Sequence, residues 1–398
     1  MKKKILYLVH RIPYPPNKGD KIRSFNILKY LSSDYEVHLA AFVDDPNDWQ
    51  YLSALDDYCV DSYVAPLKPL RSKLRSLPAL LGDRPMSVPY YADAGMRVWI
   101  ETQQRQHQFD AVLVFSSAMA QYVVGDMWAK VKRVVDFVDV DSDKWMQYSK
   151  SKSWPMNWLY RREADTLLAY DKAVAAEFDA SLFVSAKEAE LFCKLAPESA
   201  EKTSYFNNGV DTEFFSPAKQ FDSPYADGSR TIVFTGAMDY WANVDAVVWF
   251  SSQILPTICQ QHTNVKFYIV GSKPDEKVIA LAANPNIVVT GSVEDMCPYL
   301  AHAAVAVAPM RIARGVQNKV LEAMAMERPT VVSPQGYEGI NAEAGRELIV
   351  ASEAHEWIDA VAGLLTNEAA NGMGAAARQR VVQDYSWQGS LARLGQFL

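Results

Sequence analysis

The chain has 398 residues, a formal net charge of −7, and a composition of 49% hydrophobic and 22% charged residues. This length exceeds what one hydrophobic core usually supports, so we expect two globular domains. An acidic chain of this kind argues against a general nucleic-acid binder. The four cysteines are far apart and form no C-x-x-C pair. We therefore expect a reducing compartment and no zinc site of standard spacing, and no apolar run is long enough to span a membrane.

The first half of the chain alternates strands and helices. An apolar strand at residues 5–9 runs straight into a proline-rich loop without a signal-peptide cleavage site. A helix at 21–31 and a second strand at 36–42 follow. This strand–helix–strand opening predicts a doubly wound parallel sheet, in which ligands bind at the carboxyl ends of the strands.

The loop after the first strand holds several candidate binding residues. Arg11 and Arg23 are candidates for contact with phosphate or an acceptor, and Gly19 and Asp20 stand where the loop meets the helix. Asp20 is also a predicted N-cap of that helix. His10, at the end of the strand, is either a catalytic residue or a structural one, and the sequence leaves these alternatives open.

Residues 66–85 combine several prolines with six leucines and five cations, and four of these cations alternate with the leucines. Basic and apolar faces in an acidic chain suggest a patch that lies on a membrane surface. The alternative is a solvated helix that packs its leucines inward, and the interrupting prolines favour this alternative. The residues concerned are the cations Lys68, Arg71, Lys73 and Arg75 and the leucines Leu67, Leu70, Leu74, Leu77, Leu80 and Leu81.

Two further buried strands are predicted at residues 110–115 and 133–138. The second ends in a run with four aspartates, Asp136, Asp139, Asp141 and Asp143, of which Asp139 and Asp141 form a D-x-D motif. Acids at a strand end can bind a cation or act as the base for an acceptor. A long helix at 158–178 and another strand at 182–185 follow.

The second half begins after a polar linker at residues 216–229. A strand at 231–235 ends at Gly236, the loop 270–273 contains Lys273, and a strand at 287–290 leads into another glycine loop. The loop after the first of these strands carries no cation. Lys273, Lys319 and Arg314 are therefore the available cations for an anionic ligand in this half.

The chain is organised around residues 311–334, which follow an apolar strand at 305–309. A loop with Gly315 and Val316 leads into a helix with Asn318 as its predicted N-cap. A strand, a glycine loop and a helix N-terminus together make an anion site, and Lys319 in the first turn suits a bound diphosphate. Glu322 lies one turn further on, where its carboxylate can accept two hydrogen bonds from a diol.

These residues resemble the nucleotide-sugar site of the retaining glycosyltransferases of family 4. Gly315 and the run Leu321-Glu322-Ala323-Met324-Ala325 match that family's pattern, whereas Arg314 stands where the family has a first glutamate that contacts the donor sugar. The sequence Asn208-Gly209-Val210-Asp211, followed by Phe215 and Pro217, is a second match. The stretch around Glu322 is also similar to a narrower group, the sugar transferases associated with exosortase (PEP-CTERM) exopolysaccharide loci.

The resemblance implies an α/β chain of the GT-B fold, with two Rossmann-like domains facing an interdomain cleft. Residues 1–215 would form the acceptor domain, 216–384 the nucleotide-sugar donor domain, and 385–398 a helix that crosses back to the first domain. It further implies that Glu322 binds the nucleotide ribose and that Asp139 or Asp141 has an acceptor-side role. These two aspartates and His10, which stands at a strand end, are the candidate catalytic residues. The aromatic residues of the adjoining stretch would stack on sugar rings or pack in the core: Trp145, Tyr148, Trp154, Trp158 and Tyr160.

The expected activity is retaining, metal-independent transfer of a hexosyl group from a nucleotide diphosphate sugar to a saccharide or polyprenyl-linked acceptor. The nucleotide sugar is a co-substrate, and no cofactor or metal is expected. We expect a cytoplasmic protein with a peripheral contact to the inner membrane surface and a role in exopolysaccharide or glycoconjugate biosynthesis. Two alternatives remain, a nucleotide-sugar 2-epimerase and a non-catalytic saccharide-binding relative, and the second is prompted by Arg314.

Overall fold

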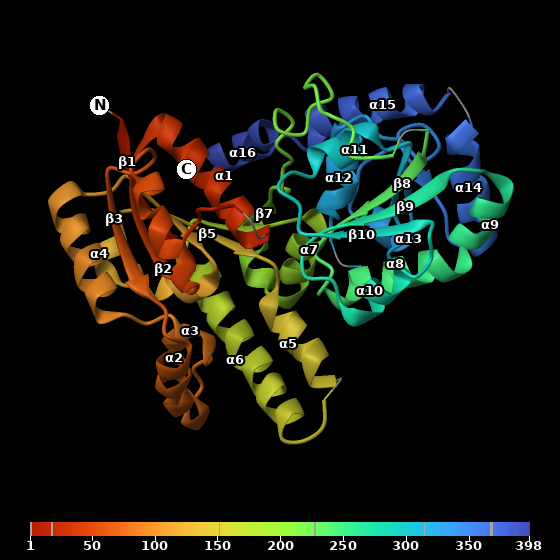
Figure 1. The fold of residues 1–398 in the computed structure, drawn as a ribbon. Helices are drawn as coiled ribbons and strands as arrows, with labels where there is room; N and C mark the ends of the chain where they lie inside the picture. The colour runs from red at the N-terminus through yellow and green to blue at the C-terminus, as the bar shows by residue number, and fades with distance from the viewer. Residues whose placement is uncertain (1, 17–18, 151, 227, 314, 367–368) are drawn as a thin grey trace. The chain divides into compact units, whose positions relative to one another are not determined.

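The computed structural model describes residues 2–16, 19–150, 152–226, 228–313, 315–366 and 369–398. The chain divides into two compact units (Figure 1). Unit 1 contains Met1–Asn207 together with Ser390–Leu398, and unit 2 contains Asn208–Gly389. The division after Asn207 lies eight residues before the end of the acceptor domain expected from the sequence, and the last nine residues group with unit 1.

Unit 1 is built on a parallel sheet of seven strands in the order β3-β2-β1-β4-β5-β6-β7. The direction of strand addition reverses between β1 and β4, which is the topological switch point of a doubly wound sheet. The central strands are runs of apolar residues that are buried on both faces, as parallel sheets require. The strands are β1 (Lys3–Val9), β2 (Tyr35–Val43), β3 (Asp61–Pro66), β4 (Ala111–Phe115), β5 (Lys132–Val138), β6 (Ala180–Phe183) and β7 (Thr203–Tyr205).

Helices connect these strands and cover the sheet. The α-helices are α1 (Gly19–Asp34), α2 (Pro69–Ser76), α3 (Ser87–Tyr90), α4 (Ala94–His107), α5 (Asp141–Lys150), α6 (Met156–Glu177), α7 (Ala186–Leu195) and α16 (Trp387–Gly395). Short 3-10 segments are η1 (Pro46–Leu55), η2 (Leu77–Leu81), η3 (Ser117–Tyr122), η4 (Asp126–Trp128) and η5 (Pro197–Lys202). Figure 1 shows α2, α3, α5 and α6 projecting from the same end of the unit.

Unit 2 has six parallel strands in the order β10-β9-β8-β11-β12-β13, with its switch point between β8 and β11. The strands are β8 (Arg230–Thr235), β9 (Val265–Val270), β10 (Ile287–Gly291), β11 (Val305–Ala308), β12 (Thr330–Val332) and β13 (Ile349–Val350). The helices are α8 (Trp241–Gln253), α9 (Leu255–Gln261), α10 (Glu276–Leu281), α11 (Cys297–His302), α12 (Asn318–Ala325), α13 (Pro334–Tyr337), α14 (Ala354–Thr366) and α15 (Ala369–Asp384).

Leu67 of the leucine-rich segment is buried, but the leucines of α2 face solvent, so the favoured prediction that the leucines pack inward is wrong for this helix. Leu70, Leu74 and Leu81 are 78%, 66% and 95% exposed, whereas α2 buries Ser72 and Ser76. Short side chains let α2 lie close to its neighbours, and the Ser76 hydroxyl donates to the carbonyl of Ser72. The guanidinium of Arg75 donates to the carbonyls of Pro89 and Tyr90 and so fastens α2 to α3.

No helix in the described part of the chain combines the length and the apolar character that crossing a membrane requires.

Candidate functional site

Three glycines stand at or just beyond the carboxyl ends of neighbouring strands in unit 2. Gly236 follows β8, Gly271 follows β9, and Gly291 ends β10. A Cβ added to Gly271 would lie 1.7 Å from the carbonyl oxygen of Gly236, so only glycine lets these two loops touch. The Gly236 N–H donates to Val270, and the Gly271 N–H donates to Gly291. Main-chain atoms that no side chain covers therefore lie beside the switch point. We call Gly236, Gly271 and Gly291 together the glycine shelf.

Lys319, in the first turn of α12, reaches across the switch point to this shelf. Its ammonium donates to Oδ1 of Asn243, lies 3.7 Å from the sulfur of Met310, and stands 4.5 Å from the ring centroid of Phe234. A Cβ on Gly236 would come within 3.3 Å of the ammonium. Burial lowers the pKa of Lys319 to about 8, against the raising effect of Glu322. Among the described residues no carboxylate forms an ion pair with this lysine.

Glu322 projects from the same face of α12, one turn beyond Asn318. Burial raises the pKa of its carboxyl to about 7, and the charge of Lys319 only partly opposes that rise. No hydrogen bond to its carboxylate is found within the described ranges, although the side chain is partly buried. A partly buried acid and a partly buried base therefore stand side by side, each with capacity for a ligand. Such perturbed pairs at a strand edge are typical of functional sites.

The loop that leads into α12 differs in detail from its prediction. The N-cap is Gln317, not Asn318, which is the first helical residue, and the Gln317 amide donates to the carbonyl of Gly315. Gly315 has φ +65°, and a Cβ added there would meet nothing within 4 Å, so the loop is open at this point. Val316 packs near Gly339, whose added Cβ would lie 3.2 Å from it. Lys273 is exposed in its loop, and Arg314 lies outside the described residues.

Unit 1 has a cluster of charged groups at its own switch point. His10 Nε2 lies 3.5 Å from Oδ2 of Asp20, and the guanidinium of Arg11 bridges Asp20 and Asp44, with 2.9 Å between Arg11 Nε and Asp44 Oδ2. The imidazole stacks on Phe115 at the end of β4 with 5.7 Å between ring centroids. The structure thus brings three predicted residues, His10, Arg11 and Asp20, to one place.

Asp20 has a different role from the predicted N-cap. Helix α1 begins at Gly19, so Asp20 lies in its first turn and turns its carboxylate toward His10 and Arg11. Burial alone would raise the pKa of Asp20, but the hydrogen bond from His10 and the charge of Arg11 outweigh it and hold that pKa well below its usual range. Nδ1 of His10 is buried without a hydrogen-bond partner among the described residues.

Arg23 lies away from this cluster. Its side chain is 1% exposed and forms a buried ion pair with Asp136, at 2.8 Å from Nε to Oδ2. It also donates to the carbonyl of Phe206 and lies 3.7 Å above that residue's ring centroid. These contacts fit a structural role for Arg23, and they leave its guanidinium buried away from a ligand.

Both aspartates of the D-x-D motif form ion pairs with Lys144. The ammonium of Lys144 lies 2.7 Å from Oδ2 of Asp139 and 3.1 Å from Oδ1 of Asp141. Burial alone would lower the pKa of Lys144, but the two carboxylates outweigh it and raise that pKa. In the part of the chain that the structure describes, no group of three or more metal-ligating side chains comes together.

Sequence reasoning missed Asn243, Asp44 and Lys144. Asp44 follows β2, the neighbour of β1, so the rule that ligands gather at the carboxyl ends of adjacent strands was a signal for it. Lys144 lies three residues after Asp141 on α5, a spacing that places both on one helix face. Asn243 carries no such signal, since its role depends on the approach of Lys319 from another helix.

Two doubly wound parallel-sheet units in one chain are the components of the GT-B fold, and solved structures with this fold match nearly the whole chain. A glycosyltransferase from Rickettsia africae has 14% identity and a TM-score of 0.66, covering 100% of this chain and 98% of its own. HepE of Anabaena, solved with UDP, has 14% identity and a TM-score of 0.65, with 99% and 98% covered. Sucrose-phosphate synthase of Thermosynechococcus elongatus has 15% identity, a TM-score of 0.65 and the same coverage.

Sequence comparison adds a family to the fold. Residues 229–367 match the family described as "Glycosyl transferases group 1". The matched segment lies within unit 2, Asn208–Gly389. This segment includes the glycine shelf, Lys319 and Glu322. None of the curated proteins matches the chain by sequence.

Proposed function

We propose that this protein is a glycosyltransferase whose unit 2 binds a nucleotide diphosphate sugar. The observation that carries the proposal is the pairing of Lys319 and Glu322 at the switch point, opposite backbone that glycine leaves bare. The match of residues 229–367 to group 1 glycosyltransferases supports it. Because the solved complexes of HepE contain UDP and UDP-glucose, uridine nucleotides are the first donors to test.

Each part of this site has a distinct task in the proposal. The diphosphate lies against the glycine shelf, where Lys319 and the N-terminal N–H groups of α12 offset its charge. Glu322, once ionised, accepts hydrogen bonds from the ribose diol. A bound diphosphate also stabilises the protonated state of Lys319, whose pKa burial lowers to about 8 in the free protein. Charge that develops on the leaving phosphate during transfer is then already balanced.

Unit 1 supplies the acceptor side of the proposed reaction. His10 is oriented by Asp20 and stacked on Phe115 at the switch point of its sheet, where a hydroxyl of the acceptor can reach it. Asp139 and Asp141 are held by Lys144, so an acceptor-side role for them requires that this ammonium moves or takes part. We propose retention of configuration, with the leaving phosphate assisting deprotonation of the acceptor and no metal required.

The exposed leucines and cations of α2 and η2 support a peripheral contact with an anionic membrane surface. In this proposal the acceptor is a saccharide or a lipid-linked saccharide at the cytoplasmic face, in exopolysaccharide or glycoconjugate synthesis. The donor sugar, including whether it is a hexose, follows from the donor screen.

Calorimetric titration with UDP, GDP, ADP and CDP and their sugars tests the donor site. We expect one diphosphate to bind, and we expect Glu322→Gln and Lys319→Met each to weaken its binding at least tenfold. Lys277→Met, which removes an exposed cation on α10, is the matched control and should bind as the wild type does. Folded Lys319→Met and Glu322→Gln variants with wild-type affinity would show that the donor does not bind here.

A further inference from the structure

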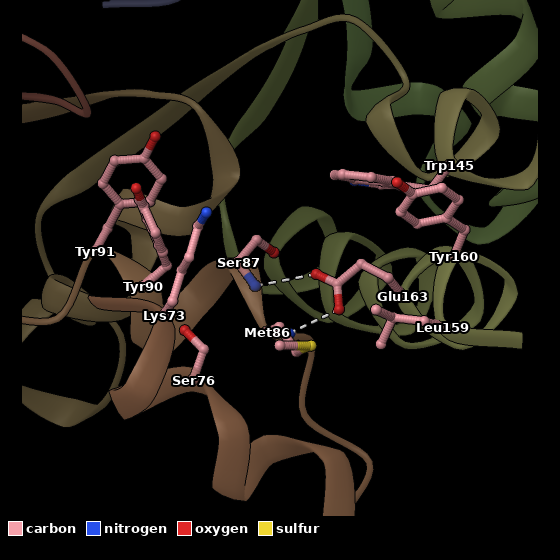
Figure 2. A pocket seen from close by; sticks show the side chains of 10 residues that line it. All are labelled: Lys73, Ser76, Met86, Ser87, Tyr90, Tyr91, Trp145, Leu159, Tyr160 and Glu163. Carbon is pink, nitrogen blue, oxygen red and sulfur yellow. Dashed lines mark hydrogen bonds between the residues drawn. The ribbon is translucent and has the colours of Figure 1, made fainter. Parts of the chain in front are cut away.

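A cavity of about 420 Å³ lies within unit 1, in the size range of ligand pockets in proteins. Its lining comes from α2, from α3 and the residues flanking it, from α5 and from α6. Figure 2 shows Lys73, Tyr90 and Tyr91 on one side and Trp145, Leu159 and Tyr160 on the other. The full lining is Lys73, Ser76, Met86, Ser87, Tyr90, Tyr91, Trp145, Leu159, Tyr160 and Glu163.

The walls of this cavity are mainly apolar. The rings of Trp145 and Tyr160 lie 5.3 Å apart between centroids and make one continuous wall, next to Leu159. The carboxylate in the lining belongs to Glu163, and it accepts hydrogen bonds from the backbone N–H groups of Met86 and Ser87 at 2.8 and 3.0 Å, as Figure 2 shows. The Glu163 carboxylate therefore fixes the start of α3 through these hydrogen bonds. Few other polar groups in the lining can form hydrogen bonds with the hydroxyls of a sugar.

One end of the cavity is next to an unpartnered apolar and basic surface. Lys73 and Ser76 belong to α2, whose leucines Leu70 and Leu74 are exposed to solvent. The side chain of Lys73 is exposed at the cavity, and no carboxylate pairs with it among the described residues. Leu81, on the adjoining segment η2, is 95% exposed. Exposed leucines beside unpaired cations match a ligand that is itself apolar and anionic.

The side of the cavity that holds Lys73 also adjoins the charged cluster at the switch point (Figure 2). Tyr91 lines this side, and its ring meets the imidazole of His10 edge to face, with 5.7 Å between centroids. The cavity therefore borders both the leucine surface of α2 and the tyrosine that contacts the residue proposed to meet the acceptor hydroxyl.

We propose that the acceptor is a saccharide joined to a lipid through a phosphate, and that the hydrocarbon chain of the lipid lies in this cavity. The chain packs against Trp145, Leu159 and Tyr160, the anionic phosphate meets Lys73, and a sugar hydroxyl of the acceptor passes Tyr91 to reach His10. The oxygen of that hydroxyl bonds to the donor sugar as the bond from the donor sugar to the nucleoside diphosphate breaks, and the leaving phosphate takes up the proton. This inference rests on the proposed function, since it names the acceptor of that reaction. It also explains why an acidic chain keeps three cations on α2, which are Arg71, Lys73 and Arg75.

Binding of soluble probes to the full-length protein tests the proposal through quenching of tryptophan fluorescence and calorimetry. The probes are farnesyl phosphate, farnesol and inorganic phosphate. We expect farnesyl phosphate to bind with at least tenfold higher affinity than farnesol, and inorganic phosphate not to bind at the same concentrations. Equal binding of farnesol and farnesyl phosphate would overturn the role of Lys73.

Variants locate the site. Leu159→Gln places an amide in the apolar wall and should weaken farnesyl phosphate binding at least tenfold. Lys73→Gln should reduce the affinity for farnesyl phosphate to that for farnesol, and Lys73→Arg should restore it. Leu81→Gln, on the same surface but outside the lining, is the matched control and should bind the soluble probe normally. Wild-type affinity in both Leu159→Gln and Lys73→Gln would overturn the proposal.

Measuring donor binding by unit 2 distinguishes a failure of the lipid proposal from a failure of the proposed function. Each variant is first shown to bind the diphosphate found in the donor screen, which also shows that the protein is folded. Loss of farnesyl phosphate binding with normal donor binding is the expected result for Leu159→Gln. A wild-type protein that binds the donor but not farnesyl phosphate would overturn the lipid acceptor and leave the glycosyltransferase proposal standing.

Discussion

The pairing of Lys319 with Glu322 places two partly buried ionisable groups within one turn of α12. Both groups lose solvation in the folded chain, and their attraction for each other offsets only part of that loss. A free protein with such a pair carries a cost that a bound ligand can relieve. Binding and stability are therefore opposed at these two residues.

We predict that Glu322→Gln is more stable than the wild type at pH 8, by about 1–2 kcal/mol. Burial raises the pKa of Glu322 to about 7, whereas the unfolded carboxyl titrates near its ordinary value. Between these values the folded carboxyl holds a proton that the unfolded chain releases, so the wild type loses stability as pH rises toward 7. The loss of attraction for Lys319 reduces the gain. Urea denaturation at several pH values measures it.

The same measurement at pH 4 should show no difference, because the carboxyl is protonated in both states there. Glu276→Gln, an exposed residue of α10, should differ from the wild type equally at both pH values. A Glu322→Gln variant that is less stable than the wild type at pH 8 would mean that the carboxylate is well stabilised in the free protein.

At the scale of elements, α2 inverts the usual pattern of an amphipathic helix. Its serines face the protein and its leucines face solvent, so the element gains little stability from its largest apolar groups. Arg75 and its bonds to the carbonyls of α3 supply part of the attachment instead. The exposed apolar surface of α2 is the basis of the membrane contact that we propose.

We predict that Leu74→Ser combined with Leu81→Gln reduces binding to anionic lipid vesicles at least fivefold and changes the free energy of unfolding by less than about 0.5 kcal/mol. Both side chains are largely exposed, so neither contributes much to the folded state. Co-sedimentation with vesicles of phosphatidylglycerol, compared with neutral vesicles, measures the first effect, and urea denaturation measures the second.

Salt provides a second readout for this surface. Attraction of the α2 cations to anionic lipid weakens as ionic strength rises, since the screening length falls to about 8 Å at physiological salt. Val98→Ser, which removes an exposed apolar residue of α4, is the matched control and should leave vesicle binding unchanged. Vesicle binding that survives the double substitution would assign the contact to another part of the molecule.

At the scale of the whole molecule, unit 1 depends on residues from the end of the chain. Leu391 and Leu394 of α16 are 3% and 0% exposed, and the guanidinium of Arg393 lies 4.6 Å from the ring centroid of Tyr205 on β7. The hydroxyl of Tyr30 on α1 lies against Gly395, where a Cβ would clash at 2.4 Å. These residues complete unit 1, although the preceding helix α15 belongs to unit 2.

We predict that deletion of residues 390–398 lowers the stability of unit 1 by about 3–6 kcal/mol, the value of burying two leucines. Donor affinity should change less than twofold, because the donor site lies in unit 2. Calorimetric unfolding with and without the donor nucleotide separates the two units, since only the unit that binds the ligand is stabilised by it. Deletion of 396–398 alone, which spares both leucines, is the control. A uniform loss of stability in both transitions would contradict the assignment of these residues to unit 1.

The fold could be predicted from the sequence wherever a single segment carries its own signal. Apolar runs such as 5–9, 231–235 and 305–309 form the buried strands expected of them, and α12 begins one residue earlier than predicted, at Asn318. Strands β3 and β9 were not predicted. The linker expected from residue 216 begins after the boundary between the two units, because unit 2 already starts at Asn208. The features that depend on neighbours were least predictable, because a periodic pattern does not say which face of a helix will find a partner.

The candidate site shows the same limit. Glu322, Lys319 and the glycine loops could be located from local spacing, whereas the burial of Arg23 and the occupation of the D-x-D motif by Lys144 depend on residues distant in sequence or on another element. The outward leucines of α2 reverse the favoured prediction because serines, not leucines, allow close packing there. Local chemistry is readable from the sequence, but the availability of a side chain for a ligand is decided by tertiary contacts.

The return of the chain to unit 1 also has a consequence for biosynthesis. Unit 1 is interrupted after Asn207 and resumes only at Ser390. A ribosome that adds about 5–20 residues per second would need roughly 10–40 s to travel from Asn207 to Ser390. During that time unit 2 is being synthesised, and β7 and α1 lack the leucines and the arginine of α16. The first-made part of unit 1 therefore stays incomplete until all of unit 2 has been synthesised, and we expect this part to be the one that needs chaperones.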